Sequence, residues 1–133
     1  MATQLTVFVP APQRWTAKGL RSYFYPLSKN AKVSLGAFSV WRKDALEWGR
    51  YLQYLVREEM ARAGFLTSKR YRIALKLLVS DRRRRDPQNF IEIISDFLQE
   101  PLGCDDSSFI FETLASEISS TPGFSIKIEG ENC

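Results

Sequence analysis

Histidine is absent from this 133-residue chain, and its absence removes several classes of chemistry. Without imidazole there is no Ser-His-Asp or Cys-His nucleophile, no histidine general base and no His-ligated zinc site. The two cysteines, Cys104 and Cys133, have no CxxC spacing, which excludes a zinc knuckle or redox motif and is typical of free thiols in a reducing cytoplasm. Acid-base or metal chemistry must therefore come from carboxylates.

Long apolar runs are lacking as well. No stretch approaches the roughly 20 apolar residues of a membrane span, and the first residues lack the basic and apolar regions of a signal peptide. With 44% apolar and 13% aromatic residues the chain has material for a core, and its length predicts a single domain over residues 1–133. We expect a cytoplasmic protein with no membrane partner.

Charge is distributed unevenly around a net value of +4. The first 43 residues carry seven basic side chains and no acid, whereas residues 101–133 hold six acids and one lysine. Such a separation allows one region to bind a polyanion and another to bind cations, although ordinary solvated charge is the alternative. Lys18, Arg21, Lys29 and Lys32 are the candidate polyanion contacts in the basic region.

Periodicity predicts an α/β (α+β) fold, a small mixed β-sheet with two main helices packed on it. Strands are expected at residues 5–9, 71–79, 109–115 and 124–128, the last two forming an antiparallel hairpin. Helices are expected from about residue 38 to Gly64 and from the Asp86-Pro87 cap to about residue 99. Residues 13–35 predict a long, basic, partly irregular segment. Trp41 and Trp48 fall in the apolar stripe of the first helix, which favours core packing over base stacking.

Acidic and amide side chains gather along the second predicted helix. Gln88, Glu92 and Asp96 are four residues apart and Asn89 is seven before Asp96, so all four share one face. Asp86 precedes this face by one turn, and the Asp105-Asp106 pair comes just before the next strand. Oxygen ligands that converge in this way suit Mg²⁺ or Mn²⁺ and the hydrolysis of phosphodiesters. A helix cap at Asp86 and a solvated face at Glu92 and Asp96 are the simpler alternatives.

Four consecutive arginines, Arg82, Arg83, Arg84 and Arg85, precede the acidic residues directly. Guanidinium groups bind phosphates, so positive charge that would hold a nucleic acid backbone lies beside negative charge that would hold a metal ion. A solvated turn is the alternative for the arginine run.

The stretch DRRRRDPQNFIEIISDFLQEPLGCDD, residues 81–106, resembles the core signature of the RusA family of Holliday junction resolvases. That signature has an arginine-flanked Asp-x-Asp-Asn, a lysine three residues after the asparagine, an aspartate four residues later and an Asp-Asp pair ahead of a strand. The matching residues are Asp86, Asn89, Asp96, Asp105 and Asp106. The resemblance implies Mg²⁺-dependent, symmetric nicking of branched DNA in recombination and repair by a homodimer, with Asp86 and Asp106 as metal ligands.

Two positions depart from the signature. Gln88 stands where the family has its second aspartate, and Glu92 stands where it has the lysine. Because Glu92 is one turn beyond Gln88, its carboxylate can reach the vacated ligand position, and the missing positive charge must then come from the arginine run. The resulting alternative is a degenerate member that binds branched or duplex DNA without cleavage, and a protein-interaction domain is a third possibility.

The candidate site can now be stated in full. The catalytic candidates are Asp86, Asp106 and Glu92. The metal-ligand candidates are Asp86, Asp105, Asp106, Gln88, Glu92 and Asp96. The DNA-binding candidates are Arg82, Arg83, Arg84, Arg85, Asn89, Lys18, Arg21, Lys29 and Lys32.

Overall fold

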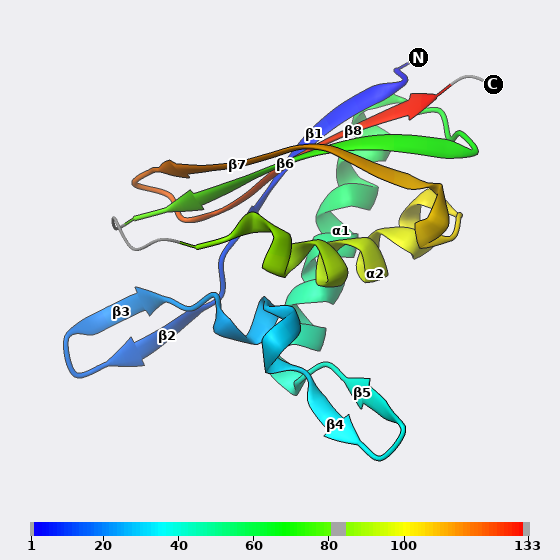
Figure 1. Cartoon of the computed structure of the whole chain (residues 1–133). Helices are drawn as coiled ribbons and strands as arrows, with labels where there is room; N and C mark the ends of the chain where they lie inside the picture. Colours follow the sequence, from blue (N-terminus) through cyan, green and yellow to red (C-terminus); the bar gives the residue numbers. More distant parts are fainter. Residues whose placement is uncertain (1, 81–84, 132–133) are drawn as a thin grey trace.

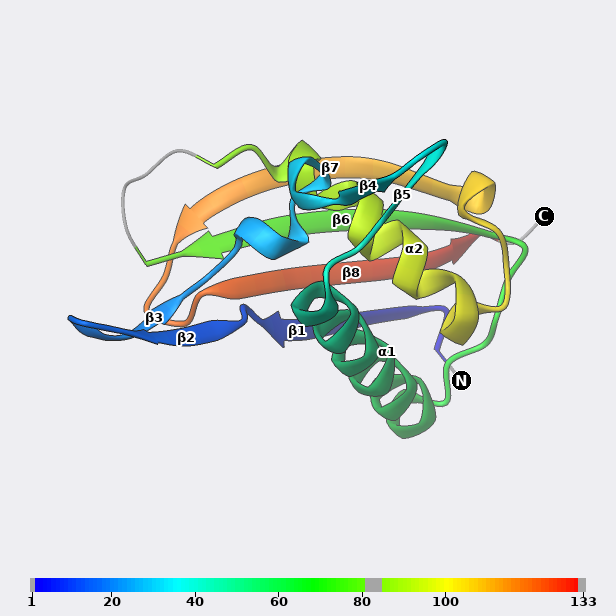
Figure 2. The same cartoon turned by 90° about the horizontal axis from the view of Figure 1, so that it is seen from below.

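The computed structural model describes residues 2–80 and 85–131 and shows a mixed sheet covered on one face by two helices (Figure 1). The sheet strands are β1 (Gln4–Pro10), β6 (Arg70–Val79), β7 (Phe109–Ile118) and β8 (Gly123–Glu131). The helices are α1 (Lys43–Ala63) and α2 (Ile91–Leu102). Figure 2, seen from the helix side, shows α1 and α2 lying across the sheet. The predicted α+β class with a mixed sheet is confirmed.

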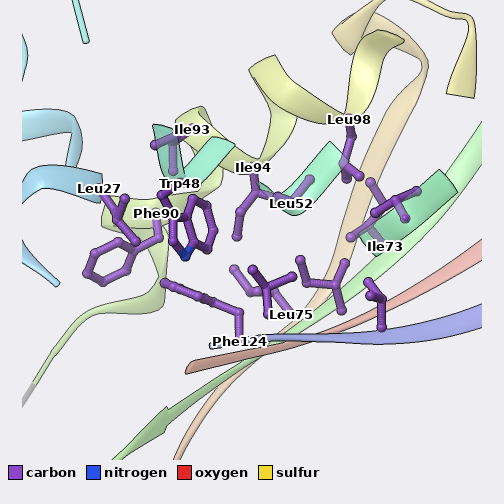
Figure 3. Close-up of a cluster of buried hydrophobic side chains, with 14 of the residues drawn as sticks. Leu27, Trp48, Leu52, Ile73, Leu75, Phe90, Ile93, Ile94, Leu98 and Phe124 are labelled. Atoms are coloured by element: carbon purple, nitrogen blue, oxygen red, sulfur yellow. The ribbon is translucent and has the colours of Figure 1, made fainter. Parts of the chain in front are cut away.

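The core lies between this sheet and the two helices. Every second residue of β6 faces inward, so that Ile73, Leu75 and Leu77 are almost fully buried, as period-two alternation predicts. From the other side, α1 contributes Trp48 and Leu52 at four-residue spacing (Figure 3). Core packing is confirmed for both tryptophans of the stripe, since Trp41 and Trp48 are 9% and 5% exposed.

The predicted hairpin of residues 109–115 and 124–128 is wrong. The sheet order is β1-β8-β6-β7, so β6 lies between the two strands: β7 pairs with β6 in parallel, and β8 pairs with β6 and β1 antiparallel. The reason is that alternation shows which face of β8 is buried, as Phe124, Ile126 and Ile128 are all 0% exposed, but not which strands lie beside it. The link between β7 and β8 is short, which favoured a hairpin in the sequence. In the structure this link passes over the end of β6, where Ser119 N–H donates to the Val79 carbonyl at 2.7 Å.

The first helix begins later than predicted. Residues near Phe38 belong to strand β5 (Phe38–Val40), which pairs with β4 (Val33–Leu35) around a turn containing Gly36 at φ 64°, and α1 starts only at Lys43. Phe38 is 65% exposed, so its three-residue spacing from Trp41 reflects no shared buried face. The predicted end is confirmed, because Gly64 closes α1 in the left-handed conformation.

The basic segment 13–35 is more regular than predicted. It forms a second hairpin, β2 (Gln13–Thr16) with β3 (Gly19–Ser22), followed by the 3₁₀ turns η1 (Tyr25–Leu27) and η2 (Lys29–Ala31). All four residues of β2 are exposed, so no inward-facing apolar alternation marks the strand in the sequence. Both small hairpins project away from the sheet on the side of the helices (Figure 1).

The second helix extends further than predicted. Pro101 lies inside α2, which continues to Leu102 and ends at Gly103 with φ 67°. Among the described residues, no helix is long and apolar enough to cross a membrane.

Candidate functional site

The strand-turn-helix that carries the candidate site has the predicted form. After β6, Asp86 caps the 3₁₀ turn η3 (Pro87–Phe90), its carboxylate accepting the backbone N–H of Gln88 at 3.0 Å, and Pro87 occupies the first helical position. The turn continues directly into α2, which begins at Ile91. Arg82, Arg83 and Arg84 lie outside the described residues.

A first pocket collects most of the predicted carboxylates. It has a volume of about 410 Å³ and is lined by Lys29, Gln88, Ile91, Glu92, Ser95, Asp96 and Asp106. Gln88, Glu92 and Asp96 therefore do share one face, and the turn before β7 brings Asp106 to it. Asn89, which was predicted on the same face, lines a different pocket, because it lies in the 3₁₀ turn before α2. We call this the carboxylate pocket.

Two of these carboxylates already have partners. Lys32 Nζ lies 2.7 Å from Glu92 Oε1, and Trp41 Nε1 donates to Asp96 Oδ2 at 2.9 Å. The Lys32 ammonium also sits over the Trp41 ring, 4.8 Å from its centroid. Lys32 and Lys29 thus supply positive charge at the pocket, whereas the sequence pointed to the arginine run for it. Trp41 is the polar contact that sequence reasoning missed, because its place in the apolar stripe indicates only packing.

Of the Asp105-Asp106 pair, only Asp106 lines the carboxylate pocket. Asp105 caps the 3₁₀ turn η4 (Asp106–Ser108) and accepts from Asp106 N–H at 2.8 Å and from the Ser107 hydroxyl at 3.2 Å. A hydrogen bond with Asp105, together with the negative charges of Asp105 and Asp96, raises the pKa of Asp106. The same hydrogen bonds lower the pKa of Asp105. Asp106 therefore lies near two other carboxylates, those of Asp105 and Asp96.

Asp86 and Asn89 line a second pocket. This pocket, about 380 Å³, is formed by Arg14, Ser22, Tyr23, Phe24, Tyr25, Ser28, Arg85, Asp86, Asn89 and Phe90, and we call it the arginine pocket. The Arg14 guanidinium lies 4.1 Å from the centroid of the Tyr23 ring, and that of Arg85 lies 5.1 Å from the Phe24 ring. The short turn η3 contributes residues to both pockets, Gln88 to one and Asp86 with Asn89 to the other. Asp86 and Asp106 thus line different pockets.

The oxygen donors of the carboxylate pocket fit a Mg²⁺ ion that takes only a few of its ligands from the protein. Within residues 2–80 and 85–131, no three acidic or cysteine side chains are grouped closely enough to form a complete metal cage. Mg²⁺, however, commonly binds through one or two carboxylates and keeps several waters or takes phosphate oxygens from its substrate. The charge of Asp96 contributes to the raised pKa of Asp106, and the side chains of both residues line the same pocket as Gln88.

The remaining DNA-binding candidates occupy two places. Lys29 lines the carboxylate pocket, while Lys18 and Arg21 are exposed on the β2–β3 hairpin. Arg14, on the same hairpin, lines the arginine pocket and was visible in the sequence only as one more charge in the acid-free region. The structure therefore brings basic side chains from residues 14–32 alongside the turn that follows the arginine run.

Compared with known proteins, the chain matches no family model and no curated protein.

Proposed function

We propose that this protein is a RusA-like, Mg²⁺-dependent endonuclease that nicks branched DNA in recombination and repair. The observation that carries the proposal is the carboxylate pocket, in which Asp96, Asp106 and Gln88 face one space with Lys29 and the nearby Lys32. Negative groups that can hold a cation beside positive groups that can hold a phosphate are what phosphodiester hydrolysis requires. The ordered match of residues 81–106 to the RusA signature supports the same conclusion.

Each group of residues has a distinct role in this proposal. Asp106 and Asp96 would hold Mg²⁺ with the Gln88 amide oxygen, and the bound ion would activate water and stabilise the leaving oxygen. Lys29 and Lys32 orient the scissile phosphate and offset the charge that develops on it. Asp86 holds the start of η3, so its carboxylate fixes the position of Gln88 through the bond to the Gln88 N–H.

Two further properties complete the proposal. Symmetric nicking of a four-way junction requires two active sites, so the protein acts as a homodimer. We also propose that it acts in the cytoplasm, where its cysteines would stay reduced.

The deciding experiment is nicking of a synthetic four-way junction with Mg²⁺ or Mn²⁺, run beside binding of the same junction without metal. We expect symmetric nicks, lost in Asp106→Asn while binding persists. Glu47→Gln is the matched control, because it removes an exposed carboxylate that lines neither pocket. Binding without nicking would reject the endonuclease, and absence of both nicking and binding at low salt would reject any function on branched DNA.

A second candidate function is binding of branched or duplex DNA without cleavage. The observation that favours it is that Glu92 is paired with Lys32 and Asp96 with Trp41. Two of the three carboxylates that line the pocket are thus already engaged by protein groups, which competes with binding of a metal ion. In that case the protein binds the junction but does not nick it at any Mn²⁺ concentration. Titration calorimetry with Mn²⁺ then gives the same result for wild type and Asp106→Asn. Binding that fails to weaken as salt rises would exclude this candidate too, since phosphate contacts are strongly salt-dependent.

A further inference from the structure

The β2–β3 hairpin carries an exposed tryptophan that the core does not use. Trp15 is 80% exposed, and its partner across the hairpin, Leu20, is 41% exposed. The turn is held by Thr16, whose hydroxyl donates to the Gly19 carbonyl at 2.9 Å and accepts from Lys18 N–H at 3.2 Å. Gly19 supplies the positive φ of 104° that the turn needs. The hairpin is therefore an ordered platform that holds a large aromatic ring in solvent.

The two faces of this hairpin differ in chemistry. Directly opposed residues share a face, so Trp15 and Leu20 form an apolar face and the Arg14–Arg21 pair forms the other. Lys18 adds a third positive charge at the turn. Two arginines directly opposite each other repel, which is unfavourable for the hairpin alone and is relieved by a bound anion. A flat apolar ring flanked by cations complements a polyanion that carries flat apolar groups, which is the chemistry of nucleic acid.

The hairpin also leads directly to the candidate site. Its two strands end at the arginine pocket, where Arg14 and Ser22 line the same wall as Asp86 and Asn89. In Figure 1 the hairpin extends outward from this end of the molecule, on the side of the helices. DNA whose backbone lies against the two pockets would therefore meet the Trp15 face as it leaves them.

We infer that the β2–β3 hairpin is a stacking wedge for branched DNA. Trp15 stacks, with Leu20 beside it, on a base that the branch point leaves without a neighbour on one face, while Arg14, Lys18 and Arg21 contact the adjoining phosphates. The inference rests on the proposed function and deepens it, because it assigns recognition of the open branch point to a specific side chain. Continuous duplex offers no free base face without unstacking, so the wedge favours junctions over duplex.

The test compares binding of a four-way junction and of a duplex of the same sequence by full-length protein without metal. Trp15→Ala is expected to weaken junction binding about 5- to 100-fold, the range for loss of one stacked base, and duplex binding much less. Trp15→Phe restores most of the affinity because a ring remains. Phe38→Ala is the matched control, since Phe38 is a 65% exposed aromatic on the other small hairpin, and it leaves junction binding unchanged.

A second readout places the ring at the branch point. 2-Aminopurine at the junction centre is expected to lose fluorescence with wild-type protein but not with Trp15→Ala. Equal junction affinity of Trp15→Ala and wild type overturns the wedge and leaves the proposed function intact, whereas wild-type protein that binds no junction overturns both. If Trp15→Ala instead converts a dimer to a monomer in sedimentation, the apolar face is an interface between copies and the wedge is wrong.

Discussion

The contact between Trp41 and Asp96 joins the core to the carboxylate pocket, and its removal by Trp41→Phe has a calculable effect. The change deletes an indole donor bonded to a carboxylate at 2.9 Å. A hydrogen bond to a charged group contributes about 1.5–3 kcal/mol, and we take about 1.5 because Asp96 is only half-buried. The smaller ring at a 9% exposed position costs about 1 kcal/mol more through lost packing. The free energy of unfolding should fall by about 2–3 kcal/mol.

Urea unfolding of a double-mutant cycle isolates the hydrogen bond. Trp41→Phe combined with Asp96→Ala should show a coupling energy of about 1–1.5 kcal/mol. Trp48→Phe is the control, because the Trp48 indole donates to the Pro10 carbonyl at 2.8 Å and not to Asp96. Its effect should add to that of Asp96→Ala within about 0.5 kcal/mol. A Trp41–Asp96 coupling no larger than that of the control would refute the reasoning.

Three other predictions test helix packing, one hydrogen bond and the pKa of one cysteine. Gly49→Ala should lower stability by about 1 kcal/mol, since the added Cβ would lie 2.5 Å from the Phe97 ring, yet it should raise stability in a Phe97→Ala background by urea unfolding. Tyr71→Phe should cost about 1–2 kcal/mol in thermal unfolding, because Ser68 N–H loses the hydroxyl to which it donates at 2.7 Å. Burial and the nearby Asp105 raise the pKa of Cys104, so with the other cysteine changed to serine its thiol should react with Ellman's reagent at pH 8 more slowly than free cysteine.

The sequence predicted those elements whose buried face shows a clear period. The alternation of β6 and the apolar stripe of α1 report burial directly, and the Asp86-Pro87 pair reports a cap that depends on adjacent residues alone. The β2–β3 hairpin could not be predicted in this way, because all of β2 is exposed. The pairing of β7 was missed for another reason: the link before β8 is short and gives no sign that β6 lies between the two strands.

The candidate site was likewise predicted where local spacing reports it and missed where it depends on distant contacts. Helical spacing placed Gln88, Glu92 and Asp96 on one face, and the structure adds Asp106 to the same pocket. Spacing could not show that Asp86, two residues before Gln88, lines a different pocket, because the first turn is a 3₁₀ turn whose side chains point to either side. Contacts between residues about 60 positions apart, such as Lys32 with Glu92, leave no local signal at all.

The Lys32–Glu92 pair bears on the proposed RusA-like site, because position 92 is one of the two departures from the signature. Where the signature has lysine, this chain has Glu92, and Lys32 Nζ lies 2.7 Å from that carboxylate. This ammonium group comes from the basic segment and not from α2. Because Lys32 also rests on Trp41, which holds Asp96, one contact chain fixes a cation and two acids relative to each other. These contacts keep both signs of charge together at the carboxylate pocket.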